Sequence, residues 1–228
     1  MRVGAGLVTL FSPPGAVLVN ASHETAVMVK SFSEPGSLRT LAATTQCTLI
    51  GPGAGLTPDT FENTIAVLDG AASAVLDADS LTIFKVAPER LFEAMKIPVL
   101  FTPHEGEFKR IFPDLLNSYD RKTAVLTAAK HSGAVVILKG PASLIASPDG
   151  RVVENIHASP FLATAGSGDV LAGIAGGLMA QGMDVFDAGC AACWVHGQLG
   201  LRLGPGLIAE DLPDALPALL SELYASRT

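Results

Sequence analysis

The pattern with the clearest chemical potential is a glycine-rich turn before an apolar helix. Ala165-Gly166-Ser167-Gly168-Asp169 precedes an apolar run from Val170 to Ala175. Small residues let backbone N–H groups face a ligand, and a helix N-terminus carries about half a positive charge, so a phosphate could bind at this turn. The spacing matches neither a Walker loop nor the dinucleotide-binding fingerprint. The alternative is an ordinary helix start capped by Ser167 or Asp169.

Asp169 itself has two interpretations. It could be a first-turn carboxylate that the helix dipole stabilises. It could also be a general base beside an anion site, taking a proton from a substrate hydroxyl as that oxygen bonds to a phosphoryl group. The residues that follow four predicted strands favour the second interpretation.

Glycines and polar residues follow four short apolar runs. These segments are Gly51-Pro52-Gly53-Ala54-Gly55, Asp77-Ala78-Asp79-Ser80, Thr102-Pro103-His104-Glu105-Gly106-Glu107 and Lys139-Gly140. If the strands are parallel, all four segments lie along one sheet edge, where doubly wound folds bind ligands. Asp77 and Asp79 could anchor a magnesium ion through water or cap the next helix, and the sequence leaves both interpretations open.

The elements that must position these residues alternate along the chain. Apolar or β-branched runs between helical stretches predict an α/β fold, a mostly parallel central sheet with helices on both faces. The predicted strands are Leu7–Phe11, Ala26–Val29, Thr48–Ile50, Ala74–Leu76, Val99–Thr102 and Val135–Leu138, with a hairpin of Ser143–Ala146 and Val152–Asn155. The predicted helices are Pro58–Leu68, Glu105–Phe112, Asp120–Ser132, Gly168–Gln181, Val185–Leu203 and Leu212–Ala225. No repeat or linker marks a second domain, so we expect residues 1–228 to form one.

The composition excludes several classes of protein. The chain is 49% hydrophobic and 16% charged, with a net charge of −7, which rules out disorder. The absence of a basic cluster argues against nucleic acid and against an anionic membrane surface, so a small molecule is the expected partner. Leu7–Phe11 predicts a buried strand rather than a secretory signal, because Pro13-Pro14 interrupts the apolar stretch. No apolar run reaches the ~20 residues of a membrane-spanning helix.

Three cysteines, an odd number, predict a reducing, cytoplasmic location without disulfides. Cys190 and Cys193 form a C-x-x-C pair with His196 one helical turn beyond, but no second pair accompanies them. We therefore expect packing, with His196 as a core imidazole whose hydrogen bonds are satisfied, rather than metal or redox chemistry. His104-x-x-Glu107 lacks the second histidine of a zinc-binding helix. No structural metal site is predicted.

Three segments together resemble one known family, the ADP/ATP-dependent NAD(P)H-hydrate dehydratases. They are Val75-Leu76-Asp77-Ala78-Asp79-Ser80-Leu81, Leu100-Phe101-Thr102-Pro103-His104-Glu105-Gly106-Glu107-Phe108 and Gly166-Ser167-Gly168-Asp169-Val170-Leu171-Ala172-Gly173. The resemblance extends from about Gly4 to Leu223. It implies a ribokinase-like fold and a repair reaction in which ADP or ATP, with Mg²⁺, drives dehydration of the hydrated cofactors NADHX and NADPHX to NADH and NADPH.

The resemblance also implies roles for individual residues. Asp169 would be the catalytic base and would contact the hydrate together with His104 and the Gly53/Gly55 turn. The residues around the nucleotide and its phosphates would be Lys139, Gly140, Pro141, Ala142, Ser143, Gly166, Ser167 and Gly168. A homo-oligomer is expected from the family and the apolar content.

The chain departs from the family pattern in places. The usual opening segment of the family does not precede Gly4, from which we expect a missing sheet strand and an exposed apolar edge. Pro141 stands where the family has Ala or Gly and removes a backbone donor. Two alternative functions stay open: a small-molecule kinase of the same fold acting on a vitamin precursor, and an inactive truncated domain that binds only nucleotide or partner chains.

Overall fold

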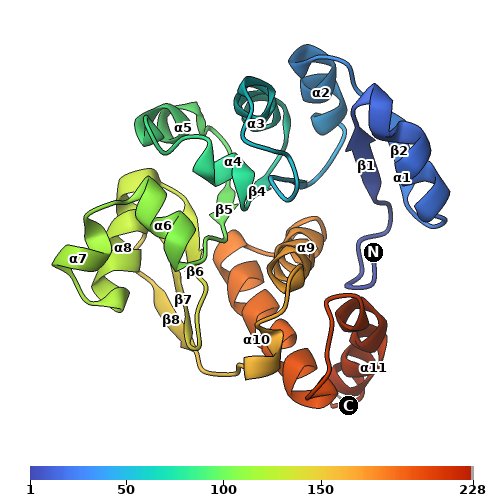
Figure 1. The fold of residues 1–228 in the computed structure, drawn as a ribbon. Coiled ribbons are helices and arrows are strands. Elements are labelled where there is room, and N and C mark those ends of the chain that lie inside the picture. Colours follow the sequence, from blue (N-terminus) through green and yellow to red (C-terminus); the bar gives the residue numbers. More distant parts are fainter. Residues whose placement is uncertain (227–228) are drawn as a thin grey trace.

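The centre of the structure is a six-stranded sheet. The computed structural model describes residues 1–226, and the strands follow the order β3-β4-β5-β6-β7-β8 (Figure 1). The first four strands run parallel, and the last two form an antiparallel hairpin. Their bounds are β3 (Thr48–Ile50), β4 (Ala74–Leu76), β5 (Val99–Phe101), β6 (Val135–Leu138), β7 (Ser143–Ala146) and β8 (Val152–Asn155). The predicted mostly parallel sheet is confirmed.

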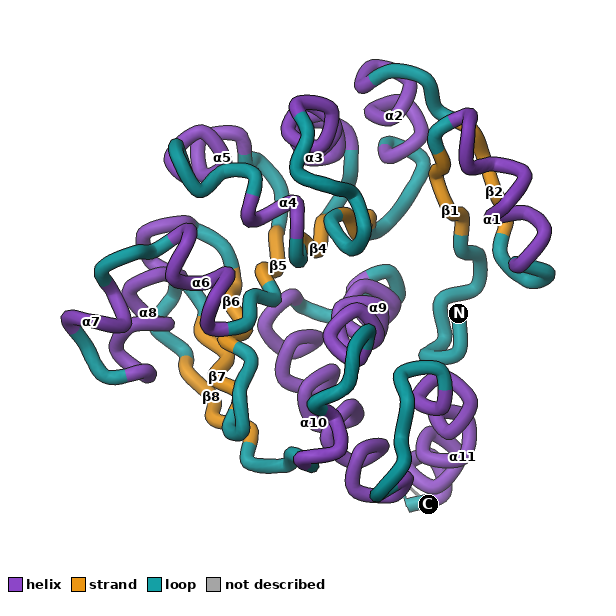
Figure 2. The backbone as a smooth tube through the Cα atoms, viewed as in Figure 1, coloured by secondary structure: helices purple, strands orange, loops and turns teal. Residues whose placement is uncertain are grey.

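Helices cover both faces of this sheet (Figure 2). Side chains alternate between the faces along each strand: Leu76 and Phe101 enter one hydrophobic cluster, and Val75 and Leu100 enter the other. The first cluster includes residues of α2 (Pro35–Ala42), α3 (Pro58–Gly70), α4 (Asp79–Thr82), α5 (Pro88–Ala94), α6 (Glu105–Ile111), α7 (Leu115–Ser118) and α8 (Arg121–Ser132). The second includes residues of α9 (Ser167–Met179), α10 (Val185–Leu203) and α11 (Asp211–Ala225).

A second, separate sheet contains only β1 (Thr9–Ser12) and β2 (Met28–Ser31), which run parallel. The helical segments η1 (Pro14–Ala16) and α1 (Val17–His23) connect them. Both strands begin two residues later than predicted. The prediction of a buried strand at Leu7–Phe11 is wrong, since Leu7 is 83% exposed and Leu10 38% exposed. The physical reason is that β1 pairs with β2 alone within residues 1–226, so that Phe11 packs against the first hydrophobic cluster while Leu7 and Leu10 stay exposed.

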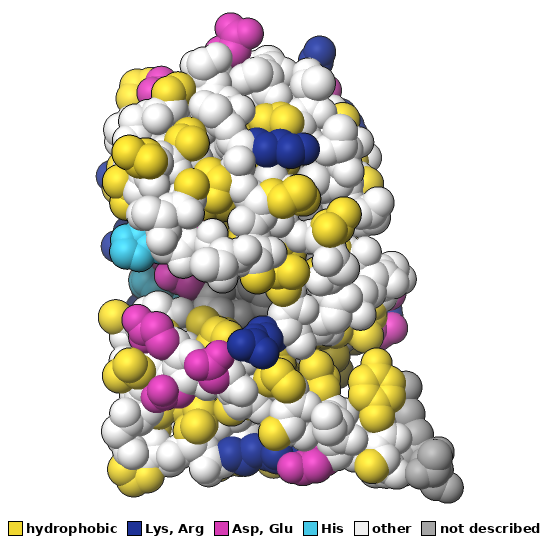
Figure 3. All heavy atoms as spheres, turned by 90° about the vertical axis from the view of Figure 1, so that its right-hand side faces the viewer, with side chains coloured by type: hydrophobic (Ala, Val, Ile, Leu, Met, Phe, Trp, Pro, Cys, Tyr) yellow, Lys and Arg dark blue, Asp and Glu magenta, His cyan; other side chains and the backbone are white. Residues whose placement is uncertain are grey.

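The edge of the larger sheet at β3 is open in the described part of the chain, because β3 pairs only with β4. Leu49, in the middle of β3, is 36% exposed. The face that carries α1 and α11 is hollowed near its middle, with hydrophobic side chains scattered over it (Figure 3).

The longer helices match their predictions closely, and α10 has the predicted bounds. Five short helices, α1, α2, α4, α5 and α7, and the two single turns η1 and η2 (Pro160–Leu162) were not predicted, because segments this short have little periodicity to detect. No helix in residues 1–226 combines the length and apolarity needed to cross a membrane.

Candidate active site

The four predicted segments after β3, β4, β5 and β6 do lie along one sheet edge, since these strands are parallel and adjacent. At β3, Gly51, Gly53 and Gly55 have φ angles of 130°, 65° and 79°, which favour glycine. A Cβ atom on Gly51 would stand 1.8 Å from the carbonyl oxygen of Asp77. Glycine is therefore required for the turns after β3 and β4 to lie against each other.

The two carboxylates after β4 hold neighbouring segments rather than capping α4. Asp77, 1% exposed, places Oδ1 3.0 Å from Nζ of Lys139. Asp79 accepts the backbone N–H of Gly55 at 2.8 Å through Oδ2. Ala78 between them has φ 49° and ψ −117°, a conformation costly for a residue with a Cβ atom. With Ala78 in this conformation, the Asp77 carboxylate reaches Lys139 after β6 and the Asp79 carboxylate reaches Gly55 after β3.

His104 is the N-cap residue of α6, and its side chain accepts hydrogen bonds from the first turn of that helix. Its Nδ1 accepts the backbone N–H groups of Gly106 at 2.9 Å and Glu107 at 3.3 Å. Glu107 in turn accepts the N–H of His104 through Oε2 at 2.9 Å. Since Nδ1 is an acceptor, the neutral ring carries its proton on Nε2. The imidazole is 55% exposed, so it is accessible to a ligand from solvent.

Lys139 joins the β5 and β6 exits to the start of α9. Its backbone N–H donates to the carbonyl of Pro103 at 2.9 Å. Its ammonium lies 3.0 Å from Asp77, 4.0 Å from Glu107 Oε2 and 3.1 Å from the position of a Cβ atom on Gly168. The side chain is 18% exposed. One cation therefore stands among two buried carboxylates and the glycine turn.

The first turn of α9 has no side-chain cap. Gly166 is the N-cap residue, in the left-handed region with φ 82°, and makes no capping hydrogen bond. Ser167 is not a cap, since its hydroxyl pairs with Nε2 of His196 at 2.9 Å. Nor does Asp169 hydrogen-bond to the backbone of α9 within the described part of the chain. The interpretation of this turn as a helix start capped by Ser167 or Asp169 is therefore wrong. The N–H of Ser167 donates to the carbonyl of Thr164 at 3.3 Å, whereas the N–H groups of Gly168 and Asp169 have no side-chain cap and are available to an anion.

The electrostatic surroundings of Asp169 make it more basic than an ordinary aspartate. Partial burial raises the pKa of its carboxyl, the negative charge of Asp77 raises it further, and Lys139 lowers it. A carboxylate whose pKa is raised is a better proton acceptor. The side chain nevertheless stays accessible on the exposed face of α9.

The loop after Lys139 lies against a cation that sequence reasoning missed. A Cβ atom on Gly140 would stand 2.7 Å from Nη2 of Arg121, whose Nη1 donates to Glu105 at 3.0 Å. Pro141 and Ala142 line a cavity of about 500 Å³; its other lining residues are Asp120, Arg121, Lys122, Leu144 and Glu154. Arg121 is 19 positions before Gly140, and no local spacing predicts the contact.

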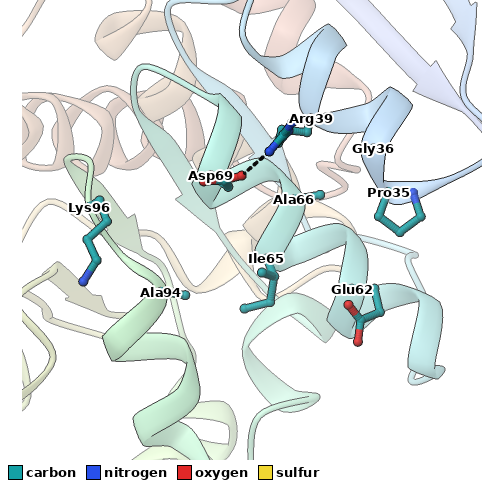
Figure 4. A pocket seen from close by; sticks show the side chains of 9 residues that line it. All are labelled: Pro35, Gly36, Arg39, Glu62, Ile65, Ala66, Asp69, Ala94 and Lys96. Carbon is teal, nitrogen blue, oxygen red and sulfur yellow. Dashed lines mark hydrogen bonds and ion pairs between the residues drawn. The ribbon is translucent and has the colours of Figure 1, made fainter.

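A second cavity, of about 420 Å³, lies away from these residues (Figure 4). It is a hollow between α2, α3 and the end of α5. The residues that line it are Pro35, Gly36, Arg39, Glu62, Ile65, Ala66, Asp69, Ala94 and Lys96. None of them belongs to the predicted site. Two of the charged residues that line this cavity, Arg39 and Asp69, already form an ion pair with each other at 2.8 Å.

The cysteine pair on α10 belongs to the interior. Cys193 is 3% exposed within a hydrophobic cluster, and burial raises the pKa of its thiol to about 12. Burial also raises the pKa of Cys190 to about 11. His196 is partly buried and has Ser167 as its partner, as expected of a satisfied imidazole. Its position beside the glycine turn was not predicted.

The site offers few ligands for a magnesium ion. No three His, Cys, Asp or Glu side chains within residues 1–226 are grouped so that they could hold a metal. Asp77 and Asp79 already bind Lys139 and Gly55. Oδ2 of Asp77 is buried without a protein partner, which suits one water-mediated contact. The described residues therefore offer a magnesium ion one water-mediated carboxylate contact and no closed set of ligands.

The fold is that of a ribokinase-like α/β protein, with the uncapped start of α9 at the edge where the parallel strands end. The structure is similar to a ribokinase-like superfamily protein from Enterococcus faecalis, with a TM-score of 0.84, 25% identity and coverage of 97% of this chain and 78% of the other. A family model described as NAD(P)H-hydrate dehydratase matches residues 1–217. The chain belongs to this family.

Individual relatives agree. An ADP-dependent (S)-NAD(P)H-hydrate dehydratase from Neisseria meningitidis is 45% identical over 162 residues, covering 67% of this chain and 54% of the relative. The ADP/ATP-dependent NAD(P)H-hydrate dehydratase of Bacillus subtilis, co-crystallised with ATP/Mg²⁺ and soaked with CoA, has a TM-score of 0.80 at 25% identity, covering 97% of this chain and 83% of the other. The chain spans about a third of the length of the bifunctional NAD(P)H-hydrate repair enzymes that it matches.

Proposed function

We propose that this protein dehydrates NADHX and NADPHX to NADH and NADPH at the expense of ADP or ATP. The observation that carries the proposal is the uncapped start of α9, with Asp169 in its first turn and the Lys139 ammonium against Gly168. This arrangement offers free N–H groups and one cation to phosphates, and a basic carboxylate to a hydroxyl.

In the proposed reaction, the Asp169 carboxylate accepts the proton of the ring hydroxyl as that oxygen bonds to the terminal phosphorus of the nucleotide. The nucleotide leaves one phosphate shorter. The carbon–oxygen bond of the new phosphate ester then breaks, inorganic phosphate leaves with the electron pair of that bond, and the adjacent ring carbon releases a proton to solvent, which restores the double bond. Mg²⁺ bound with the nucleotide would neutralise phosphate charge.

The proposed division of the site follows the strand exits. His104, after β5, and the Gly53/Gly55 turn, after β3, would hold the hydrate. The nucleotide would lie along the loop after β6 and the start of α9, which include Lys139, Gly140, Pro141, Ala142, Ser143, Gly166, Ser167 and Gly168. Support comes from the ATP/Mg²⁺ co-crystallised with the Bacillus subtilis relative and the ADP-dependence in the name of the Neisseria meningitidis relative.

The proposal is tested by adding purified protein to NADHX with ADP or ATP and Mg²⁺ and following NADH absorbance. NADH should form only when nucleotide is present, and a chelator should stop it. A phosphorylated product that accumulates without NADH would instead support the small-molecule kinase. Nucleotide binding without any product would support the inactive domain. The cytoplasmic location and the homo-oligomer stay predictions.

A further inference from the structure

The segment between β8 and α9 follows the surface of α10 closely. Asn155, at the end of β8, donates through Nδ2 to the carbonyls of His157 at 3.0 Å and Cys193 at 3.2 Å. A Cβ atom on Gly197 would stand 1.9 Å from the His157 carbonyl oxygen. The backbone of the segment therefore touches the backbone of α10, and glycine is needed for that approach.

One turn further along α10 the same closeness recurs. A Cβ atom on Gly200 would stand 2.5 Å from Cγ of Leu162, in the single turn η2. Gly197 and Gly200 are three positions apart, so they share one face of the helix. The segment between β8 and α9 packs along this face, passes through η2 and reaches Gly166, where the candidate phosphate-binding turn begins.

His196 precedes Gly197 in α10, and it contacts the residue that follows the segment between β8 and α9. Its Nε2 lies 2.9 Å from Oγ of Ser167, the first residue of α9, which is 2% exposed. Burial lowers the pKa of the imidazole to about 4, so the ring is neutral near pH 7. A buried hydroxyl needs a hydrogen-bond partner, and the imidazole supplies one without adding charge near the anion site.

This pairing has a consequence for the turn. Ser167 is the first helical residue of α9, and the N-cap residue is Gly166, which has no side chain to cap the turn. The Ser167 hydroxyl is held instead by His196 on α10. The same contact anchors the backbone of residues 166–168 to α10, a helix of 19 residues that packs in the core.

We propose that His196 is a positioning residue for the phosphate-binding turn: it anchors the Ser167 hydroxyl to α10 and, with Gly197 and Gly200, sets where that turn lies. The inference rests on the proposed function for its catalytic consequence. It adds to that function a residue that touches neither nucleotide nor hydrate and acts through Ser167.

The test compares His196→Phe, His196→Gln and Ser167→Ala with the unmodified protein in NADHX turnover. Loss of the contact should raise KM for ADP or ATP roughly tenfold, as expected for one buried group left without its partner, and change kcat less. The glutamine amide can still pair with Ser167, so His196→Gln should recover most of the affinity. Combining His196→Phe with Ser167→Ala should cost little beyond either change alone. His131→Phe, on α8 and paired with Glu89, is the matched control.

Amide hydrogen exchange gives a readout that does not depend on activity. The N–H groups of Ser167 and Val170, which donate to the carbonyls of Thr164 and Gly166, should exchange faster in His196→Phe, with only a modest fall in the thermal midpoint. A purely structural role would lower the active fraction, and so kcat, without raising KM. Unchanged KM and unchanged exchange in the folded variants would overturn the inference; if His196→Phe does not fold, the same result with Ser167→Ala decides against it. If the unmodified protein neither binds nucleotide nor forms NADH, the proposed function fails, and exchange still judges the inference.

Discussion

Asp169→Asn separates the two interpretations of the carboxylate at the start of α9. The change keeps the shape of the side chain and removes its basicity. Asp169 makes no hydrogen bond to the α9 backbone within residues 1–226, so no contact that holds the helix is lost. A general base contributes typically ~10²–10⁴-fold to a rate. We therefore expect NADHX turnover to fall by about that factor, with an unchanged circular dichroism spectrum.

Nucleotide binding should respond in the opposite direction. Burial and the charge of Asp77 raise the pKa of Asp169, which shows that a negative charge here is unfavourable. Removing that charge beside the phosphates leaves nucleotide affinity unchanged or higher. The contribution of Asp169 to stability is present below its ordinary pKa and is lost as pH rises through the raised value. At neutral pH the asparagine variant should therefore be no less stable than the unmodified protein.

The assay pairs NADH formation at saturating ADP or ATP with a calorimetric nucleotide titration. Asp59→Asn is a matched control, because Asp59 lies in the first turn of α3, a helix with the same number of residues as α9. It should leave turnover unchanged. Turnover of the unmodified protein should fall on acidification through the raised pKa of Asp169. Near-normal turnover in Asp169→Asn would refute its role as the base.

Other predictions follow from the same cluster. Lys139→Met leaves Asp77 buried without its partner, so urea unfolding should show a loss of about 3–5 kcal/mol and titration should show weaker nucleotide binding; unchanged values would contradict the ion pair's importance. Ala78→Gly relieves the backbone at φ 49° and should raise the free energy of unfolding by about 1 kcal/mol, whereas a lower melting temperature would show that no strain is stored there. Burial raises the pKa of every thiol, to about 11 for Cys47 and Cys190 and about 12 for Cys193, so an aromatic disulfide reagent at pH 8 should label the native protein slowly and the denatured protein fully; rapid native labelling, or an intact mass with a Cys190–Cys193 bridge, would contradict this.

Local patterns in the sequence determined much of the architecture. Apolar runs such as Val135–Leu138 predict buried parallel strands because both of their faces are covered, and α10 has the predicted bounds because its apolar pattern is long. The glycine and carboxylate segments after four strands predict the edge at which the candidate site lies, because parallel strands bring their carboxyl ends together. These features depend on residues near one another in the chain.

Only the tertiary structure decided how the side chains at that edge are paired. Lys139 and Asp77 are 62 positions apart, Ser167 and His196 are 29 apart, and Asp79 and Gly55 are 24 apart. No periodicity links such residues, because their contact depends on which strands and helices become neighbours. The exposure of β1 has the same origin: its apolar sequence favours burial, but burial requires a neighbouring strand or helix to cover it, and within the described chain β2 is its only strand partner.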